Sequence, residues 1–518
     1  MTEFEALLIL LLAAVILAAL ARRAGVPYPA FLAIGGAVLA FVPGAPTFSI
    51  EPELALALFV APVLLDAAYD ASPRDLKENW VPLVSLVIGS VAVTTMAVAV
   101  VVRALVPAVP WAAAIALGAI VSPPDATAAT AVLRHVKPPH RILTILEGES
   151  LLNDASALLI YRLALGALAA NAFSVRTVAP AFLVAVVGSA VAGPIAAWLV
   201  LRLTRNVQDV PTAIIVQFIS TFGVWILADR IGLSGVLTMV CYALAIARPA
   251  SQLTPARMRI PSYAVWETAV FVLNVLAFVF IGLQIRPILS GLDSAVRVRY
   301  LWVAGAVLLT VIVVRLAWVM IYYAVVRWRR THPGRRRRSS RQPPTIGGAL
   351  VVGWSGMRGI VTLAAALALP IEAGGTAFPF RDPMILTAFA VVLGTLVIQG
   401  LSLGPLLRSF HLPDDHPVER EVVAARDRAL SAALATFDGL DSELVRAVRQ
   451  EFASHLRPAR GEAGDEAEGH EQLHQSALFA ARRVVFEMRA TGEIGDDAFH
   501  LLEEEFDWLE MANGERES

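Results

Sequence analysis

The stretch EGESLLNDAS, residues 147–156, places three carboxylates inside an otherwise apolar segment that runs from Ile142 to Ala170. A segment of this length and character is typical of a helix that crosses a bilayer, whose hydrocarbon core is about 30 Å thick. A charged side chain at the centre of such a helix costs about 3 kcal/mol on insertion scales, so it normally faces a protein interior or an aqueous cavity. The stretch therefore predicts a membrane protein with a buried polar site.

The rest of the chain repeats this apolar pattern. Of its 518 residues 57% are hydrophobic and 16% charged, whereas soluble domains are about a quarter charged. The pattern predicts an all-α polytopic membrane protein with about thirteen transmembrane helices, near residues 4–21, 28–44, 52–71, 81–106, 111–134, 141–170, 177–203, 211–229, 231–248, 265–288, 299–327, 346–370 and 383–410. A net charge of −1 argues against a nucleic-acid partner, and the single Cys241 excludes an intramolecular disulfide.

Basic residues predict the orientation. Arg22 and Arg23 follow the first segment and no basic residue precedes it, the reverse of a secretory signal peptide. Positive residues concentrate in cytoplasmic loops, so we expect an N-terminus outside the cell and a C-terminus in the cytoplasm, with the protein in the cell (inner) membrane. The loops expected in the cytoplasm carry most of the arginines and lysines, above all the arginine-rich run at 327–341. A binding site for anionic lipids is a second interpretation of that run.

The composition changes near His411. Residues 1–410 are expected to form the transmembrane domain, and 411–518 a cytoplasmic helical tail that a low-complexity segment at 458–472 divides. Six of the nine histidines lie at or beyond His411, so we expect the tail to regulate transport in response to pH or a partner. HEQLH (470–474) matches the H-E-x-x-H zinc-protease pattern, but it lies in a glycine- and acid-rich segment, and a surface helix is the favoured interpretation.

Two segments carry helix-breaking sequences. GAIVSPPDATAAT (118–130) contains Pro123-Pro124, which must interrupt helical hydrogen bonds, and GGALVVGWSGMRGIVT (347–362) is rich in glycine. These two stretches lie in the fifth and the twelfth predicted spans. They occupy matching positions if spans 1–6 and 8–13 form two inverted six-helix repeats. Paired interruptions in matching segments indicate a substrate site at the bilayer midplane.

Asp154 is the main candidate for that site. It lies thirteen residues beyond Arg141, about 20 Å along a helix and so near mid-membrane. Ser150 shares its face of the helix, Asn153 is its neighbour, and Glu149 can pair with Asn153 at the i, i+4 spacing. These oxygen-bearing side chains suit a hard alkali cation.

Other intramembrane polar residues have more than one interpretation. Asp125 follows the Pro-Pro break, with Thr127 close behind, and either caps the second half-helix or joins the site. Asp66 is either a further site residue or an interfacial acid. Arg358 needs a partner inside the membrane, and Glu149 is the expected one, whereas the sequence names no partner for Arg315.

These residues predict a mechanism. One buried carboxylate holds either a proton or a cation, and this competition combined with alternating access produces antiport. Asn153 is neutral where a second acid could stand, which favours exchange of one cation for one proton, an electroneutral reaction. A cation channel is the alternative from another class, although paired interrupted helices favour alternating access.

Four motifs, GAIVSPPDATAAT, ILEGESLLNDASALLIY (145–161), FVLNVLAFVFIGLQI (271–285) and GWSGMRGIVTLAAALALP (353–370), together resemble the cation/proton antiporter-1 family of sodium/proton exchangers. The resemblance covers about residues 5–410. It implies that Asp154 binds the cation and the proton, that Asn153 marks the electroneutral branch, and that Ser150 and Asp125 contribute ligands or shape the site.

The resemblance also implies a structural Glu149–Arg358 pair. Asp66 stands where relatives often carry Glu, and Pro124 where many offer a hydroxyl. The resemblance further implies a homodimer in which a six-helix core moves against a dimerisation part. No cofactor, enzymatic activity or structural metal is expected, only Na⁺, Li⁺ or K⁺ and H⁺ as transported ions. Sodium/proton exchange is favoured, and potassium/proton exchange remains the nearest alternative.

Overall fold

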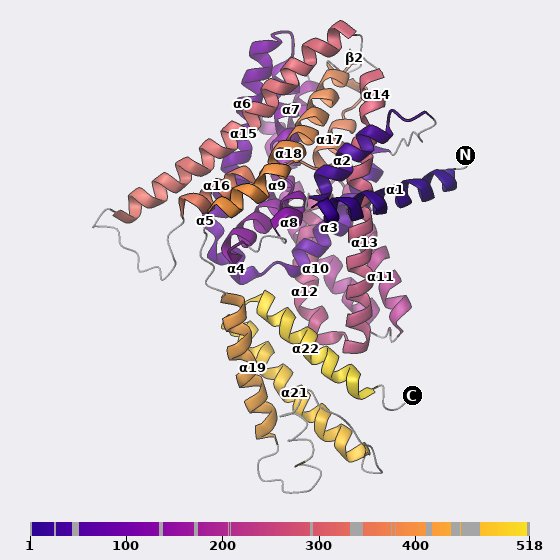
Figure 1. The fold of residues 1–518 in the computed structure, drawn as a ribbon, viewed down its shortest axis with the longest axis vertical. Coiled ribbons are helices and arrows are strands. Elements are labelled where there is room, and N and C mark those ends of the chain that lie inside the picture. Colours follow the sequence, from indigo (N-terminus) through magenta and orange to yellow (C-terminus); the bar gives the residue numbers. More distant parts are fainter. Residues whose placement is uncertain are drawn as a thin grey trace.

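Helices make up nearly all of the computed structural model (Figure 1), which describes residues 3–24, 27–43, 51–133, 138–169, 175–205, 207, 209–290, 294–331, 345–373, 376–378, 380–410, 417–436, 446 and 467–514. The predicted all-α class is confirmed. The one departure within these ranges is a hairpin of two-residue antiparallel strands, β1 (Glu372–Ala373) and β2 (Thr376–Ala377).

Helices α1 to α18 occupy the predicted membrane part of the chain. They are α1 (Glu3–Ala24), α2 (Tyr28–Leu39), α3 (Pro52–Asp70), α4 (Pro73–Glu78), α5 (Trp80–Val84), the π-helical η1 (Ser85–Ser90), α6 (Val91–Leu105), α7 (Trp111–Val121), α8 (Ala126–Leu133), α9 (His140–Ala169), α10 (Val175–Thr204), α11 (Val210–Arg230), α12 (Gly235–Leu253), α13 (Ala256–Leu283), α14 (Ile285–Ser290), α15 (Ser294–Thr331), α16 (Ile346–Trp354), α17 (Ile360–Leu367) and α18 (Arg381–Ser409).

Each predicted span coincides with a helix or with consecutive helical pieces. Seven stretches within the described ranges are long and apolar enough to cross a membrane: Trp80–Leu105, His140–Leu168, Leu183–Thr204, Val210–Arg230, Ala256–Ser290, Arg297–Arg329 and Arg381–Ser409. Four shorter apolar helices accompany them, at Tyr28–Leu39, Leu54–Tyr69, Trp111–Val121 and Gly235–Ala247. The count of thirteen crossings and the inverted repeat stay predictions.

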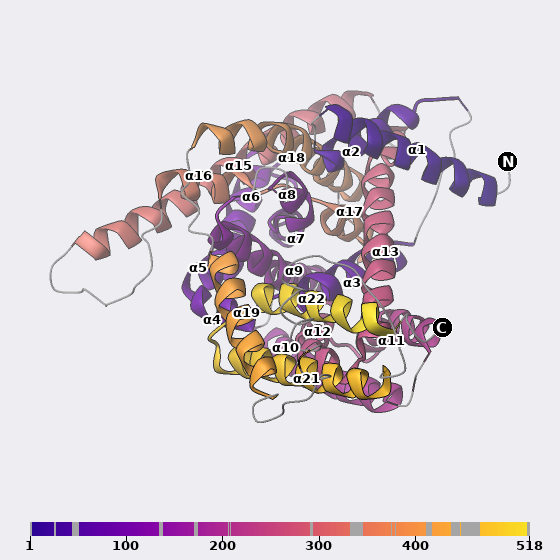
Figure 2. The same cartoon turned by 60° about the horizontal axis from the view of Figure 1, so that its bottom comes forward.

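Both predicted interruptions are present. Helix α7 ends at Val121 and α8 begins at Ala126, because Pro123 and Pro124 have no backbone N–H to continue the helix. In the second segment, helix α16 ends at Trp354 and α17 begins at Ile360. Figure 2 shows α8 and α17 near the centre of the helical assembly, surrounded by longer helices.

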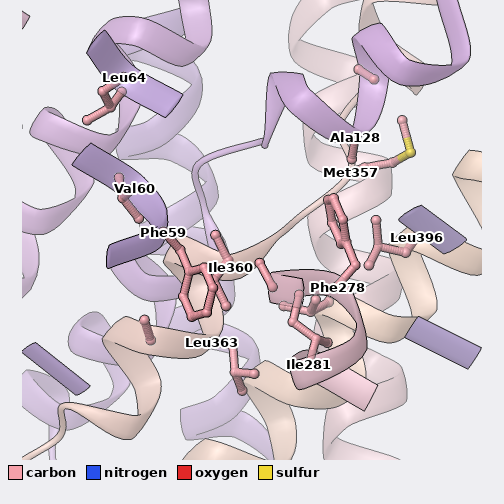
Figure 3. Close-up of a cluster of buried hydrophobic side chains, with 14 of the residues drawn as sticks. Phe59, Val60, Leu64, Ala128, Phe278, Ile281, Met357, Ile360, Leu363 and Leu396 are labelled. Atoms are coloured by element: carbon pink, nitrogen blue, oxygen red, sulfur yellow. The ribbon is translucent and has the colours of Figure 1, made fainter. Parts of the chain in front are cut away.

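Apolar side chains fix the position of the interrupted helices (Figure 3). Phe59 on α3 and Phe278 on α13 are buried in the same cluster as Ile360 and Leu363 of α17. Ala128 of α8 belongs to this cluster as well, so both broken segments share one packed environment. In such an interior a side chain cannot shift without displacing its neighbours.

The close approach of α2 and α13 depends on glycine. A Cβ added to Gly36 would lie 2.3 Å from the Val279 carbonyl oxygen, and one added to Gly282 would lie 2.2 Å from the Ala33 carbonyl oxygen. The two helices therefore pack backbone against backbone, as small residues allow in membrane helices.

The tail folds into helices with a core of their own. Helices α19 (Pro417–Ala435), α21 (Ala467–Thr491) and α22 (Asp496–Gly514) bury an apolar cluster that includes Ala429, Val485 and Phe499. This bundle lies at one end of the membrane helices, and α22 contacts α13 (Figures 1 and 2). The low-complexity break predicted at 458–472 lies largely outside the described residues.

Candidate ion-binding site

The two broken segments are joined by a backbone hydrogen bond. The N–H of Asp125, just before α8, donates to the carbonyl oxygen of Met357 in the α16–α17 break, at 2.6 Å. Helix ends leave N–H and C=O groups without intrahelical partners, and interrupted helices place four such ends inside the membrane. The chain must satisfy these groups with side chains from the two breaks.

Arg358 satisfies the carbonyl ends. Its guanidinium donates to the oxygens of Val121 at 2.9 Å and Ser122 at 3.1 Å, where α7 ends, and also to the Gly356 oxygen. A cation at a helix C-terminus is favourable because the helix dipole is negative there. The Arg358 side chain is fully buried. It therefore holds the end of α7 against the second break.

The predicted Glu149–Arg358 pair is wrong. Glu149 pairs instead with Arg315 of α15, whose guanidinium donates to both carboxylate oxygens, at 2.5 and 2.9 Å. Arg315 also donates to the Val352 oxygen of α16 at 3.2 Å, so it links three helices. The physical reason is that backbone carbonyls at the helix ends already satisfy Arg358, which leaves the carboxylate to the other buried arginine.

Asn153 extends this pair, as the i, i+4 spacing predicted. Its amide nitrogen donates to a Glu149 carboxylate oxygen at 3.1 Å. Both side chains are fully buried. Asn153 therefore helps to hold Glu149 and Arg315, and its amide oxygen makes no hydrogen bond with the described part of the chain.

Asp154 lies on α9 close to the first break. Its side chain is 7% exposed, and its carboxyl group is near enough to that of Asp125 to interact electrostatically. Ser150, one helical turn before Asp154, is partly buried. The structure therefore brings two carboxyl groups together beside the crossing, and a monovalent cation or a proton between them would relieve their repulsion.

Two glycines of the second break make room for charged side chains. A Cβ on Gly359 would lie 1.6 Å from a carboxylate oxygen of Asp125, and one on Gly356 would lie 2.3 Å from the Cδ atom of Arg315. The Asp125 carboxylate thus rests against the start of α17, the positive end of that half-helix. The capping and site interpretations of Asp125 are compatible in this geometry.

Two other predicted residues are placed less fully. Asp66 is partly buried on α3, a helix that contacts both α9 and α17. Thr127 lies in the first turn of α8, and its side chain is outside the described residues. Glu147, the third acid of the opening stretch, is exposed on α9.

Sequence reasoning missed two features of this region. The sequence shows that Arg315 lies inside the membrane, but it does not identify Glu149 as its partner. Hydropathy predicts how deep a residue lies in the membrane, and not which helices are neighbours. Tyr161, with a buried side chain, was not singled out, and its hydroxyl has no hydrogen-bond partner in the described ranges. The seven-residue spacing from Asp154, which repeats the same helix face after two turns, is the signal that could have found it.

The described residues contain no group of three or more His, Cys, Asp or Glu side chains arranged to hold a metal ion. Residues 470–474 lie within helix α21, but their side chains are outside the described set.

Comparison with known proteins identifies relatives of the whole membrane part. The family profile described as "Sodium/hydrogen exchanger, transmembrane" matches residues 8–409. A sodium, potassium, lithium and rubidium/H⁺ antiporter of Bacillus subtilis is 28% identical over 94% of this chain and 74% of its own length. A protein of the same name from Bacillus pumilus is 32% identical over 74% of this chain, which spans 58% of that relative.

A solved structure shares the fold. The sodium proton antiporter MjNhaP1 from Methanocaldococcus jannaschii superposes with a TM-score of 0.61 at 16% identity, over 80% of this chain and 99% of that one. The predicted family is confirmed by the profile match, which covers most of the chain. The protein is a multi-pass membrane protein that belongs to the sodium/hydrogen exchanger family.

Proposed function

We propose that this chain is a secondary transporter that exchanges Na⁺ or Li⁺ for H⁺ by alternating access. The observation that carries the proposal is the buried Asp154 carboxyl group beside Asp125, at the crossing of two interrupted helices. The antiporter names of the Bacillus relatives support the same activity.

The charges around the site support one-for-one exchange. Arg315 already neutralises Glu149, and Arg358 is committed to carbonyl oxygens at the helix ends. The carboxyl groups of Asp154 and Asp125 are then the groups that a transported ion meets. Asp154 binds either the cation or the proton, Ser150 and Asp125 shape the site around it, and loading with one ion excludes the other. Exchange of one for one moves no net charge.

A potassium/proton exchanger is the second candidate, because the names of both Bacillus relatives include potassium as well as sodium. Both ions prefer oxygen ligands, and the donor set suits either.

The experiment that tests the function uses everted vesicles loaded with a pH-sensitive dye, to which Na⁺, Li⁺ or K⁺ is added. We expect dequenching with wild type and none with Asp154→Asn, which keeps the shape of the side chain but cannot bind a proton or a cation in the same way. Glu505→Gln in the tail is the control and should behave as wild type. Equal exchange by Asp154→Asn would refute the proposal.

The same assay tests whether exchange is electroneutral and whether the protein is instead a channel. We propose a homodimer in the cell (inner) membrane, with the N-terminus outside and residues 411–518 as a cytoplasmic helical tail. Rates that do not change when the membrane potential is clamped would support electroneutral exchange. Cation flux that ignores an imposed pH gradient would support a channel instead.

A further inference from the structure

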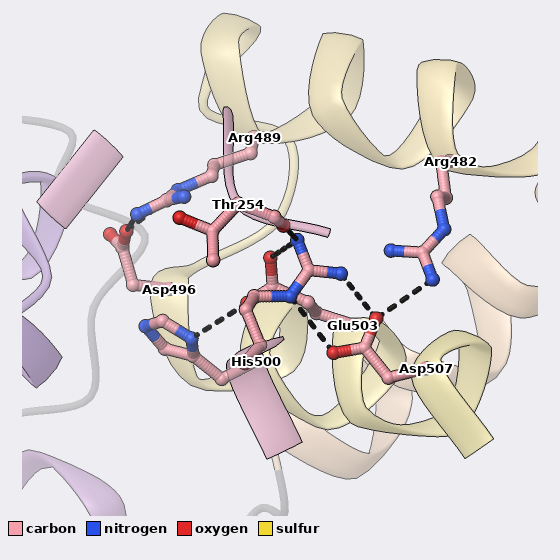
Figure 4. Close-up of polar contacts among 8 residues, drawn as sticks. Thr254, Arg482, Arg489, Asp496, His500, Glu503 and Asp507 are labelled. Atoms are coloured by element: carbon pink, nitrogen blue, oxygen red, sulfur yellow. Dashed lines mark hydrogen bonds and ion pairs between the residues drawn. The ribbon is translucent and has the colours of Figure 1, made fainter. Parts of the chain in front are cut away.

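The C-terminal bundle is anchored on the membrane helices by a buried ion pair (Figure 4). Arg259, near the start of α13, donates through Nε to an Asp507 carboxylate oxygen at 2.9 Å and also contacts its second oxygen. Glu503 lies 3.3 Å from the same guanidinium, and Arg482 of α21 donates to Asp507 at 2.7 Å. Arg259, Glu503 and Asp507 are buried.

A second contact joins the bundle to the helix that carries Asp154. His140 is the first residue of α9, about 21 Å before Asp154 along the helix. Its Nδ1 lies 3.3 Å from a carboxylate oxygen of Asp497, in the first turn of α22. Its Nε2 lies 3.5 Å from a carboxylate oxygen of Asp75 on α4. One ring thus lies between an acid of the membrane part and an acid of the tail.

This geometry favours the protonated ring, although the Thr144 hydroxyl, 3.4 Å from Nε2, can also serve a neutral one. A neutral imidazole has one N–H donor, so one of its two nitrogens would point a lone pair at a carboxylate oxygen. The charged imidazolium has two donors and can bind Asp75 and Asp497 together. Histidine ordinarily changes charge between pH 5 and 8, so the contact is sensitive to physiological changes of pH.

Other charged groups around His140 favour the same state. Asp75 lies on α4, Asp497 on α22 and Glu147 on α9, and all three interact with the ring as acids. Arg74 of α4, which acts on Asp75, is itself paired with Glu421 of α19 at 3.2 Å. The Arg74–Glu421 pair is a further contact between the bundle and the membrane part, and it does not depend on the charge of His140.

Asp75 itself stays ionised over this range. Burial alone would raise the pKa of its carboxyl group, but the hydrogen bond and charge of His140, together with Arg74, lower that pKa below its usual value. Its contribution to stability is therefore present above the ordinary pKa of an aspartate and is lost only in strong acid. A change of contact near neutral pH must come from His140.

We propose that His140 is a proton-sensitive contact through which the C-terminal bundle restrains α9, so that a protonated ring slows exchange and a neutral ring releases it. Through α22 the bundle links the start of α9 to the start of α13. Movement of α9 relative to α13 would break the His140–Asp497 contact, which is strong only at acid pH, where the ring is protonated. The inference rests on the proposed function, and it predicts slow exchange when the cytoplasmic face is acidic.

The first test measures exchange against pH at the cytoplasmic face, in everted vesicles of the full-length chain. His140→Gln should be fast at acid pH, His140→Lys slow at every pH, and Asp497→Asn should shift the activation midpoint to lower pH by about half a unit, as suits a part-exposed pair. Glu505→Gln, which removes an equally exposed tail pair with Arg426, is the matched control and should not move the midpoint.

The second test reads docking without transport. Backbone hydrogen exchange in the first turns of α22 should speed up between pH 6 and pH 8.5 in wild type, after correction for the intrinsic pH dependence of exchange, and His140→Gln should abolish this difference. A flat wild-type profile, or equal pH responses in wild type and both His140 variants, would overturn the proposal. If no cation supports antiport, the proposed function fails, and this second test still decides the contact.

Discussion

At the scale of single residues, the Glu149–Arg315 pair has the largest consequence for stability. Both side chains are almost completely buried, and the guanidinium contacts both carboxylate oxygens. Removal of one partner leaves the other charge desolvated and unpaired. In buried ion pairs this costs about 3–5 kcal/mol, whereas replacement of both partners by apolar residues is often nearly neutral.

We therefore expect Glu149→Gln to lower the free energy of unfolding by about 3 kcal/mol or more. The double variant Glu149→Leu/Arg315→Met should recover most of that loss. Denaturant unfolding in detergent, followed by tryptophan fluorescence, measures both. Asp229→Asn is the control, because it removes the exposed Arg162–Asp229 pair, 3.0 Å apart, and should cost at most about 1 kcal/mol. Equal losses for the buried and exposed pairs would contradict this account.

At the scale of elements, the two interrupted segments fit together through groups that have no substitute. Asp125 places its carboxylate where any side chain at position 359 would lie. Arg358 supplies the donors that the last carbonyls of α7 lack. Each break therefore completes the other.

Gly359→Ala tests this fit. The added Cβ would displace the Asp125 carboxylate, and a misplacement of about 1 Å in a functional group can cost about a hundredfold in rate. We expect Gly359→Ala to lose about a hundredfold in exchange rate in vesicles, while its expression and its melting temperature stay close to those of wild type. Gly166→Ala is the control, since nothing lies within 4 Å of a Cβ there although it is on the same helix as Asp154. Wild-type exchange by Gly359→Ala would show that Asp125 does not need its present position.

The helices and their breaks were largely predictable from the sequence, but the pairing of side chains between helices was not. Apolar length gave the position of each helix, Pro123-Pro124 gave the first break, and the spacing of Glu149 and Asn153 gave their hydrogen bond. These are properties of a single helix. The choice between Arg315 and Arg358 as the partner of Glu149 depends on how α9, α15 and α16 lie side by side, and hydropathy carries no information on that.

At the scale of the whole molecule, the tail is part of the same structure as the membrane helices. The sequence predicts a helical tail, but neither its apolar core nor the contacts of Arg259 and His140 were predicted. Arg259 stands in a loop-proximal position, where the excess of arginine in cytoplasmic loops already explains a basic residue. Nothing in the local pattern distinguishes such a residue from one that pairs with an acid 248 positions away.

Arg259→Gln should weaken the docking of the bundle on the membrane helices. It removes the cation from the membrane side and leaves Asp507 with Arg482 inside the tail, so the bundle itself should stay folded. We expect hydrogen exchange in α22 to rise by at least tenfold while α21 stays protected, since a buried pair loses about 3 kcal/mol or more when one partner is removed. Arg426→Gln, on the tail surface, should leave both helices protected. Unchanged hydrogen exchange in α22 would show that other contacts hold the bundle.

The hydrogen bond between Asp125 and Met357, together with the contacts of Arg358 at the end of α7, has a consequence for how the transported ion travels. Two lengths of backbone that complete each other's hydrogen bonds inside a packed membrane protein separate only at the cost of leaving those groups without partners. We therefore expect the crossing to move as one block during transport, with the hydrogen bonds between its two breaks kept.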